Sequence, residues 1–166
     1  MKETLKKYIP YCGICAAVLA IGLVFVPGFA HYGNNAEMYS GFQAIFYIPQ
    51  YLQDNTTNGR ASVAGIIALI LLVLAIPSYV FHKKSSALLL LGGILNTVAG
   101  ILFLLMDFWF KIIYRGQAVN IDFMTYLIGA MVLIVGGLTI YTAILLLLEE
   151  KKNPVKSNKY SYIKNK

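Results

Sequence analysis

The stretch that decides the fold is residues 87–106, ALLLLGGILNTVAGILFLLM, which carries no formal charge over twenty residues. A helix of this length measures about 30 Å, the thickness of the hydrocarbon core of a bilayer. Its middle contains Gly92, Gly93, Asn96, Thr97 and Gly100 within an otherwise Leu- and Ile-rich sequence. These residues predict a membrane-spanning helix with a small, polar seam that packs against other helices.

Three further uncharged runs, residues 8–30, 61–81 and 123–148, have the same character. The chain of 166 residues is 58% hydrophobic and 13% charged, whereas soluble domains average roughly 45–50% apolar and about 25% charged residues. The sequence therefore predicts an all-α integral membrane protein with four transmembrane helices in an antiparallel up-down bundle. Residues 1–148 would form this single domain, with outer loops at 31–60 and 107–122. Residues 149–166 would form a basic tail.

The charges indicate an orientation for these four spans. Both termini and the short connection between the second and third spans hold eleven lysines and three acids, a net charge of +8. The two outer loops hold three basic and four acidic residues, a net charge of −1. By the positive-inside rule, the protein is a multi-pass cell-membrane protein with both termini in the cytoplasm. This asymmetry accounts for the overall charge of +7, so no nucleic-acid partner is needed to explain it. The expected partner is the lipid bilayer, because its anionic inner leaflet attracts the basic tail.

The amino-terminal segment has two interpretations. A basic start, an apolar stretch and a small-residue ending before His31 resemble a signal peptide with a cleavage site. Alternatively, Pro10 and Pro27 suit the two ends of an uncleaved spanning helix. We favour the uncleaved helix, because the apolar run is long for a signal peptide; cleavage would leave three spans.

Cys12 and Cys15 form a C-x-x-C motif at the entrance of the first span. On a helix this spacing places both sulfurs on one face, which suits thiol–disulfide chemistry or metal binding. Membrane disulfide enzymes relay the disulfide through additional cysteines, and this chain has only two. The predicted cytoplasmic side is also reducing. We therefore expect two small helix residues, and no metal or cofactor, with a redox role as the alternative.

The first outer loop is too long to be a simple turn, and its middle has the pattern of an amphipathic helix. One face of that helix would carry Met38, Tyr39, Phe42, Ile45 and Phe46. The pattern predicts a short helix lying in the outer membrane interface. A cap over the ends of the spans is an equal alternative, and a β-hairpin is a third.

The third and fourth spans carry matching small-residue seams. Gly93 and Gly100 are seven residues apart, as are Gly129, Gly136 and Ala143. We predict that the two spans pack through these seams. Asn96 would lie near the middle of the bilayer and form a hydrogen bond across the interior. Thr97 and Tyr141 complete the candidate intramembrane polar site. No ionisable residue lies at the centre of a span, which argues against ion-coupled transport.

The second outer loop begins with an aromatic sequence, DFWFKIIY, in which Asp107 and Lys111 are four residues apart. This spacing predicts that the third helix continues beyond the membrane surface. Together the two loops supply a candidate outer surface for a partner or lipid. Its members are Tyr39, Phe42, Phe46, Trp109 and Tyr114.

Four spans with a long first outer loop resemble the outline of claudin and peripheral-myelin-type proteins. The loop at 31–60 lacks the Trp and Cys residues of their signature, so the resemblance stops at the outline. No catalytic motif is present. We expect a non-enzymatic accessory, assembly or immunity-type subunit that binds a membrane protein or a second copy of itself. The alternatives are an oligomeric channel or small-solute transporter lined by Asn96, and a thiol–disulfide oxidoreductase using Cys12 and Cys15.

Overall fold

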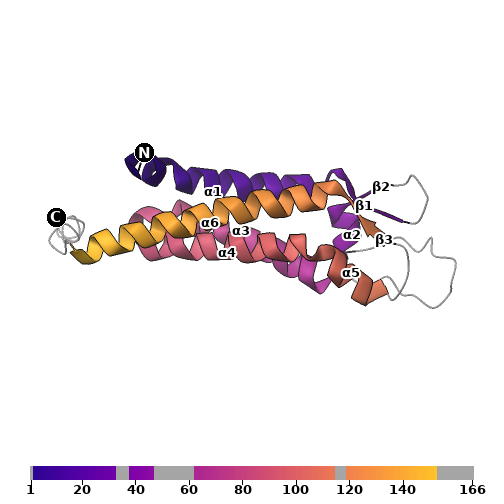
Figure 1. Ribbon diagram of the computed structural model, residues 1–166. Helices are drawn as coiled ribbons and strands as arrows, with labels where there is room; N and C mark the ends of the chain where they lie inside the picture. The colour runs from indigo at the N-terminus through magenta and orange to yellow at the C-terminus, as the bar shows by residue number, and fades with distance from the viewer. Residues whose placement is uncertain (1, 33–37, 47–61, 115–118, 153–166) are drawn as a thin grey trace.

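The computed structural model describes residues 2–32, 38–46, 62–114 and 119–152. Most of these residues are helical, and four long helices lie side by side (Figure 1). Helices α1 (Lys2–Val24), α3 (Val63–Val80), α4 (Ser86–Leu104) and α6 (Phe123–Lys152) are each long and apolar enough to cross a membrane. Helix α4 contacts α3 and α6, and α1 contacts the same two helices.

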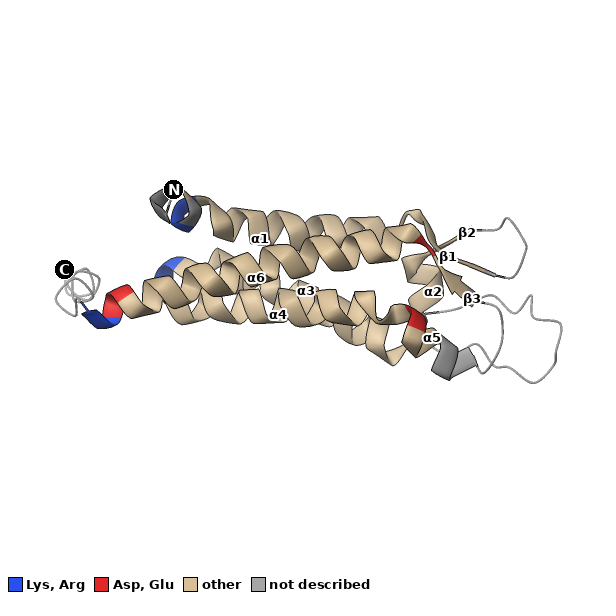
Figure 2. Cartoon of the chain, in the orientation of Figure 1, with Lys and Arg blue, Asp and Glu red and all other residues tan. Residues whose placement is uncertain are grey.

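The two ends of the structure differ in composition. Lys2 and Lys152 lie at one end, here called the terminal end, and the short elements gather at the other, called the sheet end (Figure 1). The described lysines cluster at the terminal end, together with Glu149 and Glu150, while the described aspartates lie toward the sheet end (Figure 2). The described lengths of helix between the two ends are uncharged, as transmembrane segments require.

Serine caps define the starts of α3 and α4. Ser62 Oγ accepts a hydrogen bond of 3.3 Å from Gly65 N, and Ser85 Oγ accepts one of 3.2 Å from Ala87 N. These bonds satisfy backbone N–H groups that the first turn of a helix leaves unpaired. The 3₁₀ turn η1 (His82–Lys84) joins α3 directly to α4. Helix α5 (Met106–Tyr114) follows α4 almost without interruption, as the sequence predicted.

The small-residue seams of α4 and α6 meet, which confirms the predicted packing. A Cβ added to Gly100 would lie 2.7 Å from Leu133 N and 2.8 Å from Gly129 O. A Cβ on Gly136 would lie 2.7 Å from Thr97 N. The backbones of the two helices are therefore in direct contact, which side chains larger than hydrogen at these positions would prevent.

The sheet end contains three short strands that the all-α prediction did not include. Strand β1 (Pro27–Tyr32) lies between β2 (Met38–Ser40) and β3 (Val119–Ile121), antiparallel to both. The apolar run at residues 8–30 thus ends its helix at Val24 and enters the sheet, while Pro10 lies inside α1 rather than at its start. Pro27 has no N–H to continue a helix, and Gly28 adopts a φ of 104° that few other residues tolerate.

The short helix expected in the first outer loop is α2 (Gly41–Phe46). A reciprocal capping box begins it, because Gln43 N donates to Ser40 Oγ at 3.3 Å and Ser40 N donates to Gln43 Oε1 at 3.0 Å. The apolar residues expected to share one face of this helix do not all have the same surroundings. Ile45 is buried on α3, where a Cβ on Gly65 would lie 2.7 Å from its Cγ1, whereas Phe42 and Phe46 are exposed. Helix α2 therefore covers the sheet end of α3.

Candidate functional site

The largest fully buried side chain in the described part of the chain is Tyr79, near the terminal end of α3. A Cβ on Gly13 of α1 would lie 2.5 Å from the Tyr79 Cζ atom, and one on Gly92 of α4 would lie 2.9 Å from its Cε1 atom. The ring is fully buried between these two glycines. Two positions without side chains therefore create the space that the tyrosine fills.

Asn96 lies one turn beyond Gly92 on the same face of α4, and its side chain is fully buried. Its Nδ2 atom donates a long hydrogen bond of 3.5 Å to the carbonyl of Gly13, across to α1. Its Oδ1 atom has no hydrogen-bond partner among the described residues, and neither does the Tyr79 hydroxyl. Thr139 of α6, also fully buried, lies beside that hydroxyl. We call Gly13, Tyr79, Asn96 and Thr139 the polar node.

The other two residues of the predicted intramembrane site lie elsewhere. The hydroxyl oxygen of Thr97 faces α6, 2.6 Å from where a Cβ on Gly136 would sit. Tyr141, which was expected to point into the interior, is 55% exposed. The face of α6 that meets α4 carries Gly129, Leu133, Gly136 and Ile140. Tyr141 follows Ile140 by one residue, about 100° around the helix, so it points away from this contact.

The sequence interpretation missed Tyr79, because an aromatic residue next to a charged turn resembles an interface anchor. The signal that could have identified it is complementarity. Gly13 and Gly92 lack a side chain near the same end of two long helices, and Tyr79 is the large side chain on a third helix that contacts both. Recognising that match requires knowing that α1, α3 and α4 meet, which the sequence alone does not show.

At the sheet end, polar contacts join β1 to the start of α6. The carbonyl oxygen of Phe29 accepts hydrogen bonds from Asp122 N at 3.0 Å and from Thr125 Oγ1 at 2.8 Å. His31 Nδ1 and Asp122 Oδ1 are 2.7 Å apart. Together with the pairing of Ala30 and Ile121, these contacts hold two segments that are about ninety residues apart in the chain.

An aromatic stack stands on the outside of this same end. The rings of Phe25 and Phe42 are stacked with centroids 5.4 Å apart, and those of Phe42 and Phe46 are tilted with centroids 4.9 Å apart. Their exposed fractions are 59%, 46% and 40% in chain order. We call Phe25, Phe42 and Phe46 the aromatic stack. These exposed rings come from the residue that follows α1 and from α2.

The remaining members of the predicted outer surface do not join the aromatic stack as one exposed set. Tyr39 and Trp109 are half-buried, and the Trp109 Nε1 atom is buried. Phe108 is exposed and packs edge-on against Trp109 at 5.6 Å. The side chain of Tyr114 lies outside the described residues. The structure thus brings together Phe42 and Phe46 and adds Phe25, which the sequence analysis did not single out.

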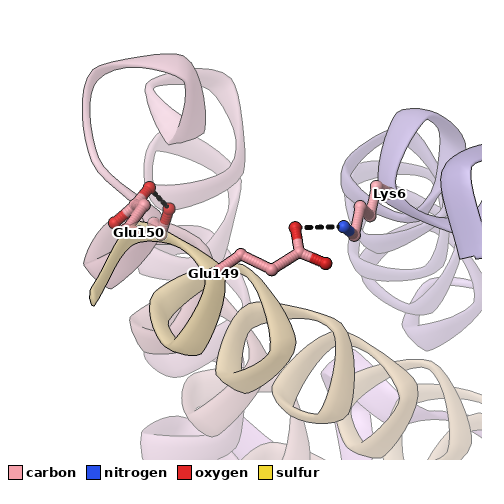
Figure 3. Close-up of polar contacts among 4 residues, drawn as sticks. Lys6, Glu149 and Glu150 are labelled. Atoms are coloured by element: carbon pink, nitrogen blue, oxygen red, sulfur yellow. Dashed lines mark hydrogen bonds and ion pairs between the residues drawn. The ribbon is translucent and has the colours of Figure 1, made fainter. Parts of the chain in front are cut away.

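At the terminal end, consecutive glutamates of α6 bind two different helices (Figure 3). Glu149 forms an ion pair with Lys6 of α1, and Glu150 accepts a hydrogen bond from the hydroxyl of Ser86, the first residue of α4. A carboxylate at a helix N-terminus is favoured by the helix dipole. These contacts hold the last turns of α6 against its two neighbours.

Cys12 and Cys15 are free and exposed on α1. Within the described ranges, no group of three or more His, Cys, Asp or Glu side chains is placed to hold a metal ion. The two thiols therefore lie on the outer face of a helix and not in an enclosed site.

The chain matches no protein-family model and no curated protein.

Proposed function

We propose that the chain is a cell-membrane protein whose four long helices cross the bilayer as an antiparallel up-down bundle. The terminal end would face the cytoplasm and the sheet end the outside. Support comes from the length and apolar character of the four helices and from the lysines gathered at the terminal end. The exposed apolar side chains along the helices, such as Val73 of α3, would then contact lipid.

We further propose that the protein acts without catalysis, as an accessory, assembly or immunity-type subunit that binds another membrane protein or a second copy of itself. The observation that carries this proposal is the aromatic stack, displayed on an end that is otherwise ordered by strand pairing and buried hydrogen bonds. Exposed aromatic rings held in fixed positions contribute strongly to binding, because they bury large areas and lose little conformational entropy.

The channel or transporter alternative would use Asn96 as a pore-lining residue. Within one chain, Asn96 is fully buried and donates to the Gly13 carbonyl. This arrangement supports a packing role between α1 and α4, where an interhelical hydrogen bond contributes about 0.6–2 kcal/mol. The thiol oxidoreductase alternative draws no support from the exposed positions of Cys12 and Cys15.

Photo-crosslinking in native membranes tests the proposed association. A photoreactive amino acid replaces Phe42 of the aromatic stack, and a matched variant carries it at Val73, which is exposed on the middle of α3. We expect a discrete crosslinked species from position 42 and only lipid adducts from position 73. Co-expression of two differently tagged copies identifies a self-association product. If the variant with the photoreactive residue at position 42 stays an uncrosslinked monomer, the proposal is contradicted.

A further inference from the structure

The polar node contains two buried atoms that the protein itself leaves unpaired. The Asn96 Oδ1 atom and the Tyr79 hydroxyl both lack a hydrogen-bond partner among the described residues, and both side chains are fully buried. Buried polar atoms without partners are rare in folded proteins, because each loses its hydrogen bonds to water on folding. Two of them close together indicate a bound molecule that supplies the missing bonds.

The two atoms belong to one small region between the helices. The Tyr79 ring lies against Gly92, and Asn96 is one turn further along the same face of α4. Both side chains also contact Gly13, Tyr79 through its ring and Asn96 through its amide nitrogen. Thr139 borders the Tyr79 hydroxyl from α6. Four helices therefore enclose the region.

The available donors and acceptors define what this region can bind. Asn96 Oδ1 can only accept a hydrogen bond, so it requires a donor. The Thr139 hydroxyl already donates to the Val135 carbonyl at 2.7 Å, so its oxygen can only accept. The Tyr79 hydroxyl has a single hydrogen and cannot supply both of these acceptors. A molecule that donates to the Asn96 and Thr139 oxygens and accepts from the Tyr79 hydroxyl would use all three groups.

The residues also limit the size and charge of that molecule. None of the four residues of the polar node is charged, so nothing there compensates an ion. A Cβ at Gly13 or Gly92 would overlap the ring of Tyr79, so the helices are close together here and the molecule must be small. We propose that the polar node binds one water molecule, which donates to Asn96 Oδ1 and Thr139 Oγ1 and accepts from the Tyr79 hydroxyl.

This site differs from the proposed association surface, because the aromatic stack lies at the sheet end and the polar node lies toward the terminal end. A bound water would join α3, α4 and α6 through hydrogen bonds that their side chains alone do not complete. It would also explain why a tyrosine rather than a phenylalanine occupies the gap between Gly13 and Gly92.

A crystal structure of the full chain, grown from a lipidic mesophase at a resolution that shows ordered water, tests the site. We expect one peak within about 3.2 Å of both Asn96 Oδ1 and the Tyr79 hydroxyl oxygen. The Tyr79→Phe variant keeps the ring and removes one ligand, so the peak should be lost. The Thr97→Val variant removes a buried hydroxyl outside the polar node, so the peak should stay.

Three results would overturn the proposal. The first is the absence of any peak in the unsubstituted protein, and the second is a direct hydrogen bond from the Tyr79 hydroxyl to Thr139 or Asn96 in its place. The third is a peak that Tyr79→Phe leaves unchanged. If Tyr79→Phe does not fold, Thr139→Val examines the third ligand while leaving the tyrosine intact, and loss of the peak is again the expected result.

Discussion

The Tyr79 ring of α3 lies directly against Gly13 of α1, so closely that a Cβ on Gly13 would be 2.5 Å from the ring. The ring is fully buried, and it touches Gly92 of α4 on another side. One aromatic side chain therefore sets the spacing of three helices. Gly13 also receives the hydrogen bond from Asn96, so the same residue takes part in both the apolar and the polar contacts of the node.

Substitution of Gly13 by Ala should destabilise the protein, because the new methyl group would overlap the enclosed ring of Tyr79. Overpacking of this kind costs about 1–3 kcal/mol. The control is Gly22→Ala on the same helix, where a Cβ would meet nothing within 4 Å. The free energy of unfolding, measured in detergent, should fall for Gly13→Ala and should change by no more than about 1 kcal/mol for Gly22→Ala. Equal stabilities would refute the described contact.

Gly100→Ala should separate α4 from α6, because its Cβ would meet the backbone atoms Leu133 N and Gly129 O and not a movable side chain. We expect the free energy of unfolding to fall by about 2 kcal/mol or more, since a shift of one helix disturbs the whole contact between α4 and α6. Gly137→Ala, at a position on α6 with nothing within 4 Å, is the matched control. The measurement is the midpoint of thermal unfolding in detergent. A control that loses as much stability as Gly100→Ala would contradict the described contact, because Ala favours a helix more than Gly does and nothing lies near Gly137.

Thr125→Val removes one of the two hydrogen bonds to the Phe29 carbonyl and keeps the side-chain volume. The variant should be less stable by about 1 kcal/mol. This loss should appear as faster hydrogen exchange at the amides that pair β1 with β3. Thr142→Val removes a hydroxyl that bonds within its own helix, to Leu138 O, and should leave that exchange unchanged. Exchange rates that respond equally to both variants would argue against the β1–α6 contact.

Glu149→Gln should change stability little, even though Glu149 forms an ion pair with Lys6. The carboxylate is 58% exposed, and exposed ion pairs contribute about 0–1 kcal/mol. The effect should decrease as salt is added, because mobile ions screen the pair. A loss above about 2 kcal/mol, independent of salt, would mean that the terminal end is far more enclosed than the structure indicates.

The sequence predicted the parts of the fold that depend on local pattern. The four long apolar helices follow from the uncharged runs. The contact between α4 and α6 follows from Gly93, Gly100, Gly129 and Gly136, because small residues at helical spacing define a face by themselves. The extension of α4 into α5 follows in the same way from the i,i+4 spacing of Asp107 and Lys111.

The parts that could not be predicted depend on partners distant in the chain. Strand β3 has three residues, too few for a β pattern, and exists because β1 lies beside it. The burial of Tyr79 and the exposure of Tyr141 depend on which helices meet, and hydropathy treats the two tyrosines alike. Phe25 joins the aromatic stack only because α2 folds back over the end of α1.

The central claim is that the four helices cross the membrane with the sheet end outside. Labelling of single cysteines by an impermeant maleimide, with Cys12 and Cys15 replaced by Ser, tests it most directly. In intact cells, a cysteine at Met38 of β2 should react and one at Lys152 of α6 should not, while permeabilised cells should label Lys152→Cys as well. A cysteine at Val73 should stay unlabelled in both. Labelling of Lys152→Cys in intact cells, or of Val73→Cys in either condition, would contradict the account.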